Sequence, residues 1–354
     1  MRRCITLFVL LVFVNSTGVV FAQKAAGTQT TQLSGPQNPR LGFVIHGGAG
    51  VIARGSLSPE REKEYKAKLE EALVAGYKAL QEGRSSLDAV EIAIRILEDS
   101  PLFNAGKGAV FTNDGRNELD ASIMYGKNQA AGAVAGVHRV KNPITLARAV
   151  MERSEHVMMI SEGAERFAEQ QKIELVDPKY FWTQPRWDAL QRILKREKER
   201  QENELGATNE AELSENKFGT VGAVALDRNG DLAAGTSTGG MTNKRFGRVG
   251  DAPIIGAGTY ANNDSCAVSA TGWGEFFIRL SVARDICSLV EYRAMPIQNA
   301  ADLVIKQKLS KLGGDGGVIA MDRLGFIGIS FNSEGMYRAY INAEGKPVVE
   351  IYGD

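Results

Sequence analysis

The sequence contains very little histidine or cysteine, the residues on which many hydrolytic and metal-dependent sites depend. Its 354 residues include three histidines and three cysteines. A G-x-S-x-G sequence occurs at 235–239, but His46, His138 and His156 all precede it, whereas the triad histidine of an α/β-hydrolase follows the serine. A Ser-His triad of that kind is therefore not expected.

Common metal-binding and phosphate-binding motifs are also absent from the sequence. It contains no H-E-x-x-H, no C-x-x-C and no close pair of histidines, so a zinc site would need scattered ligands. Gly106-Lys107-Gly108 lacks the serine or threonine and the upstream glycine of a phosphate-binding loop. An enzyme with this inventory works with hydroxyls, amines, backbone dipoles and Arg/Asp pairs. We therefore expect that its chemistry requires no cofactor.

The chain has no excess of charge of either sign. Its 42 basic residues equal its 42 acidic residues, and the isoelectric point is near 6.9, whereas nucleic-acid-binding proteins are usually markedly basic. The proportions of hydrophobic (44%) and charged (24%) residues are those of an ordinary globular protein. These values argue against a nucleic-acid partner.

The most apolar stretch of the sequence is short and lies at its N terminus. Arg2 and Arg3 precede an apolar run over 4–14, and Val20-Phe21-Ala22 places small residues where a signal peptidase reads them. The run is about half the roughly 20 residues that a membrane-spanning helix needs. We predict that residues 1–22 are a signal peptide, that the protein is exported (periplasmic or secreted), and that it has no membrane association once the signal is removed.

Two cysteines, Cys266 and Cys287, remain when the signal peptide with Cys4 is removed. Two cysteines do not form a disulfide framework in a chain of this size, although an exported protein could bridge them. We expect both to be buried small hydrophobic residues.

From residue 41 onward, the hydrophobic pattern alternates between that of strands and that of helices. The grouping predicts a central antiparallel sheet that is covered by helices, with a hairpin turn at 228–231. Strands are expected at 41–45, 108–112, 118–124, 130–138, 156–160, 218–227, 231–238, 266–271, 315–321, 325–331 and 336–342. Helices are expected at 59–83, 86–98, 144–153, 162–171, 185–200, 275–291 and 297–311.

One segment differs from this pattern, because residues 195–217 are almost wholly charged or polar. Its first part can extend the preceding helix, but the rest has too little apolar surface to form a core, so we predict a mobile linker over about 195–219. Thr220 follows this linker directly and opens an apolar strand.

A threonine in this position suits a mechanism that needs no histidine. When a chain cleaves itself before a threonine, the new α-amine is the base and the hydroxyl is the nucleophile. An α-amine has an ordinary pKa near 7.7–8.0, which lets it take a proton near neutrality. Gly219 tolerates the unusual backbone that self-cleavage requires. On these residues alone, the simpler interpretation, a strand that follows a loop, is favoured.

The surrounding motifs favour self-cleavage before Thr220 over a plain strand that follows a loop. The segment GTVGAVALDRNGDLAAGTSTGGMTNKRFGRVGDAPIIGAGTYANN, at 219–263, resembles the plant-type L-asparaginase/isoaspartyl peptidase family of N-terminal-nucleophile hydrolases. Further matches are HGGAG at 46–50, FNAGKGAVFT at 103–112, NELDAS at 117–122, AGAVAGV at 131–137 and ATGWGE at 270–275. The resemblance covers about 41–350, with its motifs in order.

The resemblance implies a fold and a processing scheme. The fold class is α+β, a four-layer αββα sandwich. Self-cleavage at Gly219–Thr220 would give an α subunit of residues 23–219 and a β subunit of residues 220–354. Two cleaved protomers would associate into an (αβ)2 homodimer.

The resemblance also assigns catalytic roles to residues at matching positions. Thr220 would be the nucleophile, with Thr238 in its hydroxyl network. Thr271 and the backbone N–H of Gly272 would stabilise the oxyanion. Asn104 would support this region.

Substrate-binding roles are implied for residues of the GRVGD and TGWGE motifs. Arg248 and Asp251 would hold the α-carboxylate and the α-ammonium of an aspartyl substrate, because a guanidinium and a carboxylate complement those two charges. Gly272 and Gly274 would line the same pocket, and Trp273 would narrow its leaving-group side. A structural sodium ion is implied on backbone carbonyls of Leu97, Glu98, Ser100, Phe103, Ala105 and Lys107.

The expected activity is therefore hydrolysis of β-aspartyl (isoaspartyl) dipeptides and of L-asparagine to L-aspartate. One alternative is a glycosylasparaginase that cleaves sugar-linked asparagine, although Thr238–Lys244 resembles the asparaginase branch more closely. A second alternative, from a different class, is an uncut, non-catalytic binding protein of the same fold.

Overall fold

The structure is a computed structural model that describes residues 41–50, 52–202 and 219–353. The predicted signal peptide and residues 203–218 of the predicted linker lie outside these ranges. Among the residues that the structure describes, no helix combines the length and the apolar composition that crossing a bilayer requires.

The described chain is mixed α and β, with two sheets. The larger sheet has eight strands in the order β12-β11-β1-β5-β6-β2-β3-β4, and every pairing is antiparallel except β3 with β4. The smaller sheet is antiparallel, in the order β10-β9-β8-β7. The strands are β1 (Gly42–Gly50), β2 (Leu119–Tyr125), β3 (Ala131–Val137), β4 (Met158–Ile160), β5 (Val221–Leu226), β6 (Leu232–Thr238), β7 (Thr259–Ala261), β8 (Cys266–Gly272), β9 (Gly316–Asp322), β10 (Ile327–Phe331), β11 (Gly335–Ile341) and β12 (Pro347–Tyr352).

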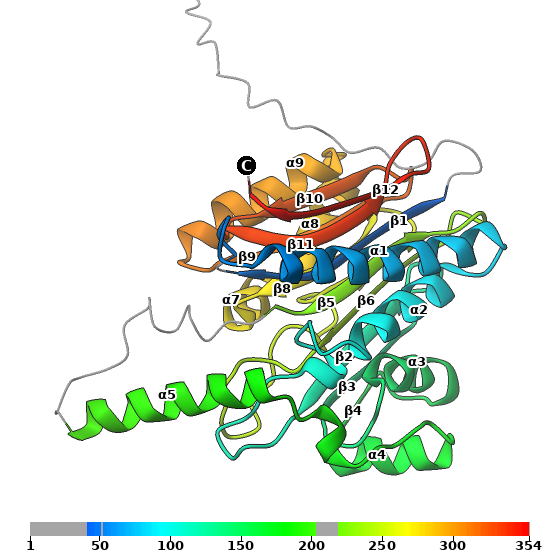
Figure 1. Ribbon diagram of the computed structural model, residues 1–354. Helices are drawn as coiled ribbons and strands as arrows, with labels where there is room; N and C mark the ends of the chain where they lie inside the picture. The colour runs from blue at the N-terminus through cyan, green and yellow to red at the C-terminus, as the bar shows by residue number, and fades with distance from the viewer. Residues whose placement is uncertain (1–40, 51, 203–218, 354) are drawn as a thin grey trace, which may run out of the picture. The chain divides into compact units, whose positions relative to one another are not determined.

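Helices pack on both sheets (Figure 1). Helices α1 (Pro59–Gln81), α2 (Ser86–Glu98) and α3 (Pro143–Arg153) contact strands of the larger sheet, and α8 (Val282–Arg293) and α9 (Ile297–Asp302) contact the smaller one. The other helical elements are η1 (Gly106–Gly108), α4 (Ser161–Gln170), η2 (Pro178–Phe181), α5 (Gln184–Glu202), α7 (Gly274–Leu280) and the π-helical segment η3 (Leu303–Leu309).

Buried apolar side chains form two cores. One lies between the larger sheet and α1–α3, and the other includes facing side chains of both sheets together with α8 and α9. Helix starts follow local chemistry: Ser58 accepts a hydrogen bond from the Arg61 N–H at the start of α1, and Ser85 and Asp88 form a capping box at the start of α2.

The predicted hairpin at 228–231 is confirmed. Its first strand, β5, begins directly after Thr220. Strands β5 and β6 pair antiparallel, and the carboxylate of Asp227 accepts hydrogen bonds from the N–H groups of Asn229 and Asp231. Gly230 has the positive φ (79°) that such turns favour. Because β5 is a central strand between β1 and β6, the residue just before it is held at a buried sheet end.

Several sequence-based expectations are wrong in detail. Residues 108–112 do not form a strand, because the N–H groups of Val110 and Thr112 bond to Asn104 and Arg116 within the loop. The expected helix at 275–291 is divided at Ser281, whose φ is +49°. Strands β7 and β12 were not expected, since the first is only three residues long and the second is partly exposed.

The two remaining cysteines are buried, as expected, and they form a disulfide, which the sequence alone left open. Cys266 lies in β8 and Cys287 in α8, with their Cα atoms 5.3 Å apart. The bridge fastens the strand that ends at Gly272 to the helix packed against it.

Candidate active site

Thr220 lies at the start of β5 and is almost fully buried, with 7% of its surface exposed. The chain reaches it through Gly219, which packs against Gly48 of β1. A Cβ atom on Gly48 would lie 2.4 Å from the Gly219 Cα, and the φ of Gly48 is +116°. Only glycine allows this approach of the two backbones.

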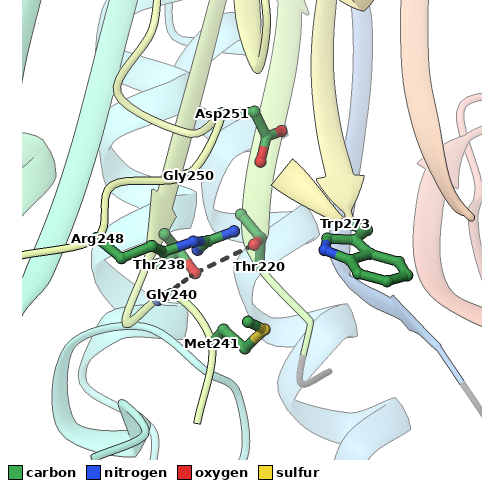
Figure 2. Close-up of a pocket in the computed structure, with 9 residues that line it drawn as sticks. Thr220, Thr238, Gly240, Met241, Arg248, Gly250, Asp251 and Trp273 are labelled. Carbon is green, nitrogen blue, oxygen red and sulfur yellow. Dashed lines mark hydrogen bonds between the residues drawn. The ribbon is translucent and has the colours of Figure 1, made fainter. Parts of the chain in front are cut away.

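Two further threonines contact Thr220. Its hydroxyl donates to Thr238 Oγ1 at 3.1 Å, and its backbone N–H donates to Thr271 Oγ1 at 3.2 Å. Thr238 also accepts a hydrogen bond from the Gly240 N–H at 3.0 Å (Figure 2). Thr238 comes from β6 and Thr271 from β8, so the site lies where both sheets meet.

The two residues predicted to bind the substrate's charged groups, Arg248 and Asp251, line the same pocket, and we call this pair the clamp. Arg248 and Asp251 lie on the loop after β6, and Figure 2 shows them around Thr220. Burial raises the pKa of Asp251 to about 7, while the charge of Arg248 opposes this shift. Its Oδ2 atom has no hydrogen-bond partner among the described residues. A buried carboxylate oxygen without a partner is suited to a cationic ligand group.

Arg248 already holds a carboxylate in this structure. Glu275 accepts two hydrogen bonds from its guanidinium, from Nε at 2.9 Å and from Nη2 at 2.7 Å. This bidentate geometry is the one that a substrate carboxylate would use. A carboxylate ligand that bound Arg248 here would share or replace Glu275.

Two residues that are predicted to stabilise the oxyanion, Thr271 and Gly272, lie beside Thr220 or at its pocket. Thr271 contacts the Thr220 backbone, and Gly272 lines the pocket. Gly274 lies behind the clamp, because a Cβ atom there would be 2.9 Å from Arg248 Nη2 and 3.0 Å from Asp251 Oδ1. A side chain at 274 would therefore displace both clamp residues.

Asn104 lies behind the pocket and supports the turn after Thr238. Its Nδ2 donates to the Gly240 carbonyl at 2.7 Å, and its Oδ1 accepts from the Val110 N–H at 3.0 Å. The Gly239 N–H donates to the Asn104 carbonyl at 3.2 Å. Asn104 is thus a positioning residue for this turn.

Sequence reasoning missed three contributors to the site. Met241 lines the pocket, Glu275 binds Arg248, and Lys244 is buried and donates to the Glu118 carbonyl at 3.0 Å. Glu275 and Lys244 belong to motifs already identified, but their partners are distant in sequence. Trp273 also lines the pocket, as expected, and its ring contacts Phe276 edge to face.

In the loop expected to hold sodium, two glycines pack closely against backbone carbonyls. A Cβ on Gly106 would lie 2.4 Å from the Glu98 carbonyl oxygen, and one on Gly108 would lie 2.0 Å from that of Phe103. The Arg186 guanidinium donates to the carbonyls of Gly108 and Leu102. Oxygen ligands of this kind fit a hard cation. Among the described residues, no group of three or more His, Cys, Asp or Glu side chains could hold a metal ion.

Comparison with known proteins agrees with this geometry. The family model described as "Asparaginase" matches residues 39–351. The chain is 52% identical over 312 residues to the isoaspartyl peptidase of Salmonella typhimurium, which covers 88% of this chain and 98% of that protein. It is 51% identical over 315 residues to the isoaspartyl peptidase of Escherichia coli (88% and 95%). It is 43% identical over 302 residues to the plant-type L-asparaginase of Pyrococcus abyssi (85% and 96%). The chain belongs to the asparaginase family.

Proposed function

We propose that the protein is an amidohydrolase that cleaves itself at Gly219–Thr220 and then hydrolyses β-aspartyl dipeptides and L-asparagine to L-aspartate. The observation that carries the proposal is one pocket that is lined by Thr220, Thr238, Arg248 and Asp251, with the Thr220 hydroxyl bonded to Thr238. The relatives named isoaspartyl peptidase and L-asparaginase support the substrate class.

In the proposed mechanism, cleavage frees the α-amine of Thr220, which takes the proton of its own hydroxyl. Thr238 orients that hydroxyl, since the two oxygens lie 3.1 Å apart. The hydroxyl oxygen attacks the β-carbonyl carbon of the substrate, and the amine or peptide on that carbon leaves with a proton. Water then hydrolyses the aspartyl ester and releases L-aspartate.

The developing oxyanion needs donors that are already in place. We assign this role to the Thr271 hydroxyl and the Gly272 N–H, at the end of β8. Before cleavage, Thr271 accepts a hydrogen bond from the Thr220 N–H and is buried. The disulfide between β8 and α8 holds this strand in position.

Both substrates present the same aspartyl head group to the clamp. Arg248 would bind the α-carboxylate in the geometry that Glu275 now shows, and Asp251 would bind the α-ammonium with its unpartnered oxygen. The two substrates differ only in the leaving amine, so one site serves both.

The finer fold and assembly predictions belong to the same proposal. Two facing sheets with helices packed on each support a four-layer αββα sandwich. We propose an (αβ)2 homodimer and export of the mature protein. A disulfide between Cys266 and Cys287 supports export, because disulfides persist in oxidising compartments.

We propose a structural sodium ion on the 97–107 loop, with no role in the chemistry. The backbone carbonyls of Glu98 and Phe103, which pack against Gly106 and Gly108, are oxygen ligands of the kind that would hold it. Sodium would neutralise the dipoles of its carbonyl ligands and stabilise the loop that carries Asn104.

Denaturing gels and Edman sequencing of purified active protein test the proposal. We expect two fragments, the smaller of which begins Thr-Val-Gly-Ala, with release of ammonia from asparagine and of aspartate from β-aspartyl dipeptides. Full activity from an intact chain would refute self-cleavage. Turnover of sugar-linked asparagine alone would indicate a glycosylasparaginase, and an uncut inactive chain would indicate a binding protein.

A further inference from the structure

A chain of buried hydroxyl groups runs between the two sheets, and the mechanism above does not use it. The hydroxyl chain consists of Ser122, Thr236, Thr259 and Ser269, which come from β2, β6, β7 and β8 and are all 0% exposed. One end meets His46 of β1, also 0% exposed, and the other end meets the Ala252 carbonyl.

Distances along the hydroxyl chain are those of hydrogen bonds throughout. His46 Nε2 lies 2.9 Å from Ser269 Oγ, which lies 2.7 Å from Thr236 Oγ1. Thr236 Oγ1 lies 2.5 Å from Thr259 Oγ1, which lies 2.8 Å from Ser122 Oγ. Ser122 Oγ lies 2.6 Å from the Ala252 carbonyl oxygen.

Most hydrogen bonds in this chain have a defined donor. Ser122 donates to the Ala252 carbonyl and to Thr259, and Thr259 donates to Thr236. Thr236 donates to the Gly258 carbonyl at 3.1 Å, which also accepts the Ala270 N–H at 2.9 Å. Between Thr236 and Ser269, either hydroxyl can be the donor.

His46, at one end of the hydroxyl chain, is neutral. Burial lowers its pKa to about 3, against a backbone contact with Thr220 that raises it. Its Nδ1 atom has no hydrogen-bond partner among the described residues. A neutral imidazole nitrogen can donate to Ser269 or accept from it.

We propose that this hydroxyl chain positions Asp251 for the substrate ammonium, with Ser122 and Thr236 as positioning residues. Ala252, whose carbonyl ends the chain, directly follows Asp251. The loop that carries the clamp is thereby tied through both sheets to β1, whose Gly48 packs against Gly219. The inference rests on the proposed function, because Asp251 is assigned there to the ammonium.

Ser122→Ala and Thr236→Val break the chain with little change of volume, and Thr236→Ser restores it. Ser330→Ala is the matched control, because Ser330 is also buried but bonds to Asp302 in the smaller sheet region. Inhibition of asparagine hydrolysis is measured with L-aspartate and with succinate, which lacks only the α-ammonium. Loss of one hydrogen bond to the clamp loop should weaken binding of L-aspartate by about three- to tenfold. Binding of succinate and the rate of self-cleavage should stay unchanged.

Equal weakening of both inhibitors, or no weakening, would overturn the proposal. If the unchanged protein neither hydrolyses asparagine nor binds L-aspartate, the proposed function fails instead. The hydroxyl chain is tested separately by ¹⁵N NMR of histidine-labelled protein: His46 should stay neutral, with no titration between pH 5 and 8. Titration of His46 in that range would refute its place at the buried end of the chain even if no variant folds.

Discussion

Arg248→Ala separates recognition of the aspartyl head group from self-cleavage. In the structure, the guanidinium is largely buried, with 18% of its side chain exposed, and it donates two hydrogen bonds to a carboxylate. Self-cleavage acts on the chain's own peptide bond, which has no free α-carboxylate. We therefore expect the variant to mature into two fragments but to lose substrate binding.

The size of the effect follows from the geometry. A hydrogen bond to a charged group is worth about 1.5–3 kcal/mol, and a loss of that size lowers kcat/KM by about 10- to 150-fold. Arg248→Lys keeps the charge but not the fork of two donors, so we expect it to recover only part of the activity.

The assay compares kcat/KM for L-asparagine and one β-aspartyl dipeptide, with fragment formation followed on a denaturing gel. Both substrates should lose activity by the same factor, because they share the head group. Near-normal turnover of both substrates by mature Arg248→Ala protein would refute the assignment of the clamp, whatever the role of Thr220.

Four further predictions follow from the structure. Thr220→Ala should leave one uncut, inactive polypeptide on a denaturing gel; fragments beginning at residue 220 would contradict its role. Gly48→Ala should slow self-cleavage strongly in a time course, because its Cβ would lie 2.4 Å from the Cα of the residue before Thr220; normal maturation would show that this approach is unimportant. The pKa of Asp251 is about 7, so binding of L-aspartate, but not of succinate, should weaken as the pH falls below 7 and the carboxylate is protonated; parallel pH profiles would argue against it. Cys266→Ser with Cys287→Ser should lower the free energy of unfolding in urea by about 3 kcal/mol, as expected for a closed loop of this length, and an unchanged urea midpoint would show that the bridge adds no stability.

Local chemistry made much of the fold predictable from the sequence. The caps before α1 and α2 and the Asn-Gly turn between β5 and β6 use hydrogen bonds within a few residues. Such signals act over short stretches of chain, so they can be recognised without knowing the rest of the molecule. Short-range signals also explain why the strand predicted at 108–112 is wrong. Its apolar residues resemble a strand, but its backbone N–H groups bond within a loop.

The sequence by itself also determined the chemistry that is available. The three histidines all precede the serine of the G-x-S-x-G sequence, which is the wrong order for the triad of an α/β-hydrolase. Thr220 follows a polar linker and opens an apolar strand. Together with the motifs, these features predict Thr220 as the nucleophile and Arg248 and Asp251 as the substrate-binding pair.

Only the tertiary structure decided which of these groups meet. Thr271 is 51 residues from Thr220, yet it accepts a hydrogen bond from the Thr220 N–H. Glu275 of α7 accepts a hydrogen bond from Arg248, which lies on the loop after β6. The disulfide and the hydroxyl chain likewise join residues from separate strands and helices. These contacts depend on how two sheets pack face to face, and sheet packing is a property of the whole core that no short stretch of sequence encodes.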